Sequence, residues 1–167
     1  MTRRRKLLEA AFRWMGIIAA FALAVAVWAG QPIRFNHQKH ISAVGLGCSD
    51  CHIYAASQPF AGLPGLEICM NCHEEPQTKN AEEQKLRTLQ EQGGSLHWNT
   101  IYKVPDHVYF SHQRHVTGGE IDCSVCHGRM AEFKTPPSRQ EVPISMDRCM
   151  KCHQQSNVNN DCLTCHK

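Results

Sequence analysis

The chain contains the pentapeptide Cys48-Ser49-Asp50-Cys51-His52, whose form C-x-x-C-H recurs five times and accounts for all ten cysteines. Two thiols at this spacing can form thioethers with the two vinyl groups of one haem, and the next residue can bind the iron as proximal ligand. Paired-cysteine zinc sites and an extracellular disulfide framework are the alternatives. Neither needs a histidine after each cysteine pair, whereas all five copies have one. We therefore expect five covalently bound haems c.

The five motifs define the expected attachment sites and proximal ligands. The attaching residues are Cys48, Cys51, Cys69, Cys72, Cys123, Cys126, Cys149, Cys152, Cys162 and Cys165. The proximal iron ligands are His52, His73, His127, His153 and His166.

The fold expected around these motifs is mainly α-helical and irregular. Only 137 of the 167 residues follow Gly30, which is roughly 27 per haem, and few of them form long apolar-periodic runs. Domains this poor in side-chain core need a cofactor, so the haem macrocycles should form most of the buried apolar mass. Gly and Pro recur at 62–65 and 135–137, which favours loops around the haems and short helices that carry the motifs.

The N-terminal thirty residues differ in composition from the rest. Arg3, Arg4, Arg5 and Lys6 precede an uncharged run from Trp14 to Gly30. As a helix at about 1.5 Å per residue, residues 7–29 approach the roughly 30 Å hydrocarbon core, with Trp14 and Trp28 at the interfaces. A cleaved signal peptide is the alternative, but Val27-Trp28-Ala29 matches a cleavage site poorly. We expect a single-pass anchor in the inner membrane, with its basic end cytoplasmic and the haem domain periplasmic.

The net charge of +3 comes from this anchor region. It holds five of the 18 Lys and Arg residues but one of the 15 acidic residues, which leaves 13 positive and 14 negative charges after Gly30. The exported part therefore lacks the basic surface that nucleic-acid binding requires. No nucleic-acid partner is expected.

An internal repeat divides the exported part into two modules. At an offset of 75, residues 35–41 (FNHQKHI) align with 110–116 (FSHQRHV), and Cys48 aligns with Cys123. We predict an anchor at 1–30, a two-haem module at 31–77, a connector at 78–106 and a three-haem module at 107–167. Within the connector, Asn80 and Glu83 form the pattern of a capping box, and Gly93-Gly94 is a stop signal, so one polar helix of about three turns is expected.

The F-x-H-x-x-H pattern followed by C-x-x-C-H motifs resembles the class III cytochromes c, especially the small c7 type, over residues 35–167. In that family the first histidine of H-x-x-H ligates the haem of the next motif, and the second ligates another haem of the same module. The resemblance implies that His37 and His40 are distal ligands opposite His52 and His73. It likewise implies His112 and His115 opposite His127 and His153.

A fifth distal ligand is then missing for the haem at His166. Six histidines lie outside the motifs, namely His37, His40, His97, His107, His112 and His115. We favour His107, because it lies five residues before His112 on the segment that enters the second module. His97 in the connector and Met146, just before the fourth motif, are the alternatives. With histidine on both faces, the irons have no open position for a substrate.

More narrowly, residues 98–112 (WNTIYKVPDHVYFSH), Cys126-His127-Gly128 and Ser145-Met146 are similar to the membrane-anchored pentahaem subunit of bacterial alternative complex III. Tyr102 stands where that family often has a histidine. The resemblance implies an electron-transfer subunit of a quinol-oxidising respiratory or photosynthetic complex, without a substrate site of its own. Its partners would be iron–sulfur and integral quinol-binding subunits, and a cytochrome c or an oxidase would accept the electrons.

Three other functions are compatible with several haems. A multihaem nitrite- or sulfite-reducing enzyme usually has an exposed five-coordinate haem with an altered motif, and no motif here is altered. A membrane-anchored multihaem quinol dehydrogenase would lack the tandem F-x-H-x-x-H repeat. A free tethered electron shuttle differs only in having no permanent partner.

Overall fold

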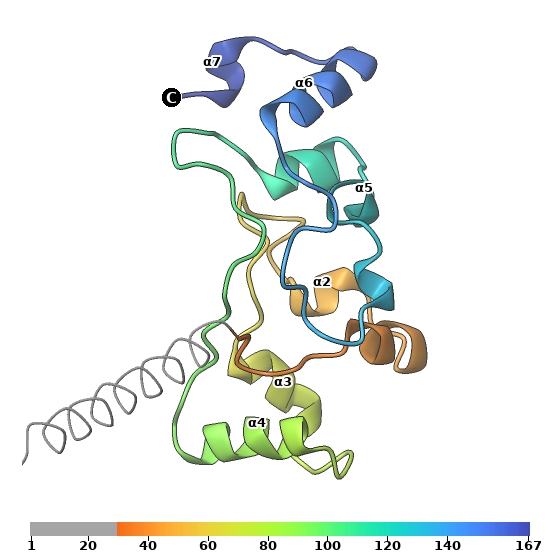
Figure 1. Cartoon of the computed structure of the whole chain (residues 1–167), viewed down its shortest axis with the longest axis vertical. Helices are drawn as coiled ribbons and strands as arrows, with labels where there is room; N and C mark the ends of the chain where they lie inside the picture. The colour runs from red at the N-terminus through yellow and green to blue at the C-terminus, as the bar shows by residue number, and fades with distance from the viewer. Residues whose placement is uncertain (1–29) are drawn as a thin grey trace, which may run out of the picture. The chain divides into compact units, whose positions relative to one another are not determined.

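The structure is a computed structural model that describes residues 30–167, of which Pro32–Lys167 form one compact unit (Figure 1). The membrane anchor expected at residues 1–30 lies outside the described residues, apart from Gly30. Within the described part, no helix combines the length and the apolar character needed to cross a membrane.

Each of the five motifs lies on its own short helix, as the sequence predicted. These helices are α2 (Cys48–Cys51), α3 (Leu66–His73), α5 (Cys123–His127), α6 (Met146–Gln155) and α7 (Cys162–Cys165). Two π-helical turns (Lys39–Ala43 and Arg114–Gly118) and one 3-10 turn (Met130–Glu132) complete the set with α4. No strand occurs among the described residues, where the single β-bridge joins Val108 to His166. The expectation of a mainly helical and irregular fold is confirmed.

Polar side chains start several of the motif helices. Asp122 caps α5 by accepting a hydrogen bond from the Ser124 N–H at 2.8 Å, and Ser145 caps α6 by accepting one from the Arg148 N–H at 3.3 Å. Such caps satisfy N–H groups that have no partner within the first turn. They define where each helix begins and therefore where its cysteines project.

The connector helix α4 (Ala81–Glu91) has the predicted length and ends. Asn80 accepts from the Glu82 N–H at 2.8 Å, and Gly93 adopts φ +65 as the Gly94 N–H reaches back to the Leu89 carbonyl at 2.9 Å. This is the Schellman pattern that a glycine permits. The prediction of a full capping box is wrong in its second half. The Glu83 carboxylate accepts hydrogen bonds from the loop before the helix and does not turn back to the Asn80 N–H.

The polypeptide has a small core of its own. Ile33, Leu66 and Leu86 pack together where α3 meets α4, and Ala55 is the other buried apolar residue in the described part. In contrast, large apolar side chains lie exposed beside the motifs. They include Ile53, Tyr54, Phe60, Val125, Met150 and Leu163. Side chains alone therefore do not fill this fold, as the sequence predicted.

The sequence repeat is also a repeat of geometry. Phe35 stacks on His40 with ring centroids 4.4 Å apart, and Phe110 stacks on His115 at 4.6 Å. The same two phenylalanines meet His37 and His112 edge-on, at 4.8 and 4.9 Å. The aromatic residue thus orients both histidines of each F-x-H-x-x-H segment.

The two repeats also contact each other through equivalent backbone atoms. The Gln38 N–H donates to the Phe133 carbonyl at 3.0 Å, and the Gln113 N–H donates to the Gln58 carbonyl at 3.1 Å. Residues 38 and 113, like 58 and 133, are related by the offset of 75. Each histidine segment is therefore held by the loop after the first motif of the other repeat. The division at 31–77, 78–106 and 107–167 stays a prediction.

Candidate functional site

The histidines of the F-x-H-x-x-H segments face histidines of the C-x-x-C-H motifs. Ring centroids are 6.2 Å apart for His40 and His73, 6.2 Å for His112 and His127, and 6.1 Å for His115 and His153. These are three of the four pairings that the resemblance implied. Each pair joins a π-turn segment to a motif helix, so the fold repeatedly aims one imidazole at another.

The fourth pairing, between His37 and His52, is indicated by electrostatics. Burial, together with positive charge on His52 and His40, lowers the pKa of His37 to about 4. Its buried Nδ1 has no hydrogen-bond partner among the described residues. A low pKa keeps this imidazole neutral, which is the form that binds a metal ion.

Backbone carbonyls hold the Nδ1 atoms of most of the other paired histidines, so that Nε2 is left for the facing side. These contacts are His40 with Asn36, His52 with Gly62, His112 with Pro59, His115 with Ser111 and His153 with Asn159, at 2.7–2.9 Å. A carbonyl partner at Nδ1 fixes the tautomer and the ring orientation of a metal-binding histidine.

His107 lies beside His166, with ring centroids 5.4 Å apart and planes at 17°. Backbone pairing fixes this arrangement: the Lys167 N–H donates to the His107 carbonyl at 3.0 Å, and the Tyr109 N–H donates to the Cys165 carbonyl at 2.7 Å.

The two alternatives for the fifth ligand, His97 and Met146, lie in exposed surroundings. His97 is exposed, and its Nε2 is hydrogen-bonded to the Ser95 hydroxyl at 2.8 Å. Met146 is 60% exposed at the start of α6. Neither has a ring contact with a motif histidine among the described residues.

The thiols form a chain of neighbours. All ten cysteines are unpaired. Burial raises the pKa of several of them, that of Cys69 to about 11, and a thiol of the adjacent motif adds to each shift. The neighbours are Cys51 for Cys69, Cys48 for Cys123, Cys152 for Cys126, and Cys126 and Cys165 for Cys149. The motif helices therefore follow one another in the order α3, α2, α5, α6, α7, which is also their succession in Figure 1.

Comparison with known proteins agrees with this geometry. Residues 108–167 match the family described as cytochrome c7 and related cytochrome c, and residues 20–94 match the class III cytochrome C family. The multiheme cytochrome c subunit of a menaquinone reductase from Nitratidesulfovibrio vulgaris is 30% identical over an aligned length of 162 residues. The match covers 82% of this chain and 77% of that protein. The chain belongs to the class III and c7-type multihaem cytochromes c.

The residues of this cytochrome fit haems bound by two histidines. At a metal–nitrogen distance of about 2 Å on each side, two imidazoles on one metal ion have centroids roughly 6 Å apart. The three pairs at 6.1–6.2 Å have this separation. The exposed apolar side chains beside the motifs would pack against the macrocycles.

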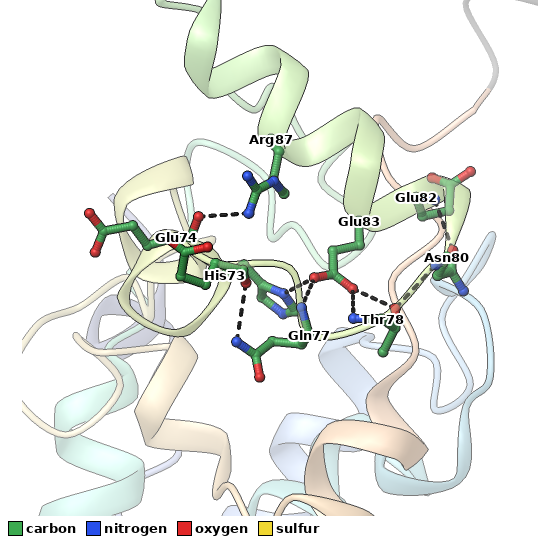
Figure 2. Close-up of polar contacts among 9 residues, drawn as sticks. His73, Glu74, Gln77, Thr78, Asn80, Glu82, Glu83 and Arg87 are labelled. Carbon is green, nitrogen blue, oxygen red and sulfur yellow. Dashed lines mark hydrogen bonds and ion pairs between the residues drawn. The ribbon is translucent and has the colours of Figure 1, made fainter.

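Two further side chains of the cytochrome touch histidines of the C-x-x-C-H motifs, and sequence patterns alone did not assign these contacts. Tyr102 meets the His127 ring edge-on at 4.4 Å, and its hydroxyl accepts from the Glu141 N–H at 2.9 Å. Glu83 lies 3.2 Å from Nδ1 of His73 (Figure 2). Tyr102 stands where the similar family often has a histidine, and this difference could have marked the position as functional. Glu83 gave no such signal, because its spacing from Asn80 predicts a helix cap.

Proposed function

We propose that the chain is an electron-transfer subunit of a quinone-linked membrane complex and carries five haems c, one at each motif. The observation that carries this proposal is the set of paired imidazoles about 6 Å apart, because each pair would hold one haem iron between its two rings. The haems supply one-electron redox chemistry, and the protein residues attach, orient and enclose them.

The axial pairs in this proposal are the expected ones, with His107 as the fifth distal ligand. They are His37 with His52, His40 with His73, His112 with His127, His115 with His153, and His107 with His166. Ring separations of 6.1–6.2 Å support three of these pairs. The ring contact at 5.4 Å supports the pair of His107 and His166, and the depressed pKa of His37 supports the other.

The order of the attachment sites makes one path through the protein. It begins at the His73 motif and continues through His52, His127, His153 and His166. The neighbouring thiols and the equivalent contacts of Gln38 and Gln113 support this order. The middle step crosses from one sequence repeat to the other, between Cys48 and Cys123.

We infer the direction of electron flow from the relative in Nitratidesulfovibrio vulgaris. That protein belongs to a menaquinone reductase, so we infer that electrons enter from a periplasmic donor and leave toward menaquinone in integral partner subunits. An anchor at residues 1–30 would hold the haem domain on the periplasmic side. The second candidate is quinol oxidation in a complex like alternative complex III, which the similarity of residues 98–112 favours.

Gentle detergent extraction tests the subunit role. The haem signal should migrate in a large stable complex with other membrane subunits, whereas a clean monomer would support a tethered shuttle and contradict the proposal. Stopped-flow spectroscopy of that complex tests the direction. A menaquinone analogue should reoxidise the dithionite-reduced haems, and the corresponding quinol should leave oxidised haems largely unreduced. The reverse pattern would assign quinol oxidation instead.

A further inference from the structure

A buried carboxylate contacts one of the five proximal histidines. Glu83 on α4 is 8% exposed, and its Oε1 lies 3.2 Å from Nδ1 of His73. Its two oxygens also accept hydrogen bonds from the Gln77 N–H at 2.5 Å and from the N–H and hydroxyl of Thr78 at 2.8 and 2.5 Å. Figure 2 shows the carboxylate between the histidine and this loop.

Three donated hydrogen bonds hold the side chain of Glu83 in place, one from the Gln77 N–H and two from Thr78. Donors of this kind compensate a buried carboxylate for the water that it has lost. The carboxylate therefore lies in a fixed position against the ring that would bind the iron.

The other proximal histidines with a known Nδ1 partner contact neutral groups. Nδ1 of His52 meets the Gly62 carbonyl at 2.7 Å, and Nδ1 of His153 meets the Asn159 carbonyl at 2.9 Å. Within residues 30–167, His73 is the one histidine with a carboxylate oxygen against a ring nitrogen. The group that contacts the other ring nitrogen of a metal-binding histidine changes the basicity of that ligand, and a carboxylate changes it more than a carbonyl.

We propose that Glu83 is a positioning residue that gives His73 imidazolate character and thereby lowers the reduction potential of the haem at Cys69 and Cys72. A more basic ligand stabilises ferric over ferrous iron, and the charge and polarity around the histidine ligand are among the ways in which proteins set haem potentials. This inference rests on the proposed haem ligation. Because the His73 site is one end of the proposed path, the carboxylate biases electrons toward the other four haems.

Spectroelectrochemical titration of the purified holoprotein tests the proposal. Glu83→Gln keeps an acceptor of nearly the same shape but removes the charge. One haem of five should become easier to reduce by about tenfold in its equilibrium constant, which corresponds to about 59 mV for one electron. Glu83→Asp keeps the carboxylate and should restore part of this shift.

Two variants separate this effect from charge and from loop stability. Glu82→Gln removes the same charge one residue earlier, from a side chain that accepts a hydrogen bond from the Arg34 N–H, and should leave all five potentials unchanged. Thr78→Val removes a hydrogen bond to Glu83 without touching the charge, so it should lower the melting temperature as Glu83→Gln does while shifting no potential to the same extent.

The proposal is overturned if Glu83→Gln shifts no haem, or shifts one no more than Glu82→Gln does. His40 faces His73, so His40→Ala should make the His73 haem high-spin. The proposal is also overturned if Glu83→Gln shifts a haem that stays low-spin in the His40→Ala variant. Failure of the proposed ligation would appear differently, as a high-spin iron in the spectrum of the wild-type protein, and failure of haem attachment would appear as fewer than five haem masses. A free shuttle would retain the potential shift.

Discussion

His107 is placed by backbone pairing and not by a helix. The bridge between Val108 and His166 puts residues 107–109 in register with residues 165–167, so the imidazole of His107 lies beside that of His166. A histidine in the connector would need a loop of its own to reach the same place. This explains why proximity in sequence to the second module favoured His107 over His97.

His107→Ala should therefore convert one of the five low-spin irons to high-spin, or to a spectrum of the His/Met type if Met146 replaces it. The other four irons should be unchanged, because their distal histidines lie on separate segments. Electron paramagnetic resonance and visible spectroscopy measure this. His97→Ala is the matched control and should resemble wild type, since His97 is exposed and bound to Ser95. Reversed results for the two variants would make His97 the ligand.

Cys126→Ala should leave the haem of the third motif with one thioether. The mature wild-type chain should carry about five haem masses that survive acid-acetone extraction, because thioethers do not release the porphyrin. The variant should lose one attachment bond and give a lower yield of holoprotein, because Cys126 lies on α5 between the helices of the first and fourth motifs. Mass spectrometry and haem staining measure both. Wild-type mass with four or fewer haems would contradict the assignment.

At the scale of elements, the turn after the third motif depends on a backbone conformation that other residues rarely adopt. Gly128 has φ +71 and ψ −149, and a Cβ at this position would collide with the Glu141 carboxylate. That carboxylate accepts a hydrogen bond from the Arg129 N–H at 2.5 Å. The backbone N–H of the same Glu141 donates a hydrogen bond to the Tyr102 hydroxyl. The glycine therefore lets the chain leave α5 while Tyr102 stays against His127.

Gly128→Ala should destabilise the holoprotein by about 1–3 kcal/mol, the usual cost of a non-glycine residue in this region. It should also disturb the spectrum of the His127 haem, since the collision displaces the loop that holds Tyr102. Thermal melts and electron paramagnetic resonance measure the two effects. Gly118→Ala is the control: its Cβ would meet nothing within 4 Å and its φ is ordinary, so its effect should be small. Equal effects of the two variants would contradict the prediction.

The motif helices and the ends of α4 were predictable because each depends on local signals. C-x-x-C-H, the Asn80 cap and the Gly93 stop act within one or two turns. The role of Glu83 was not predictable, since its spacing from Asn80 matches a capping box whether or not the carboxylate turns back. The direction of the Glu83 side chain depends on His73 and the loop at residues 77–78, which tertiary packing places beside it. The order of the motifs is likewise tertiary: Cys48 is nearer to Cys69 in sequence than to Cys123, yet it is the neighbour of Cys123.

At the scale of the whole molecule, the polypeptide depends on its cofactors for a core. Four apolar residues are buried in the described part, and three of them lie at one place, between α3 and α4. The segments that carry the other motifs have exposed side chains such as Phe60 and Leu163 on the faces where haems would lie. Ordering these segments costs conformational entropy that so few buried groups cannot offset.

The chain produced without the haem-attachment machinery should therefore not fold. Its circular dichroism should show little helix apart from the membrane-anchor segment expected at residues 1–30, and heating should give a gradual change instead of a cooperative transition. The holoprotein is the control and should melt cooperatively, because five macrocycles join the motif helices into one core. If any part of the apo chain holds structure, it should be the Ile33, Leu66 and Leu86 cluster, detected as slow amide exchange in α4. A native-like cooperative transition of the apo chain would show that its side chains suffice.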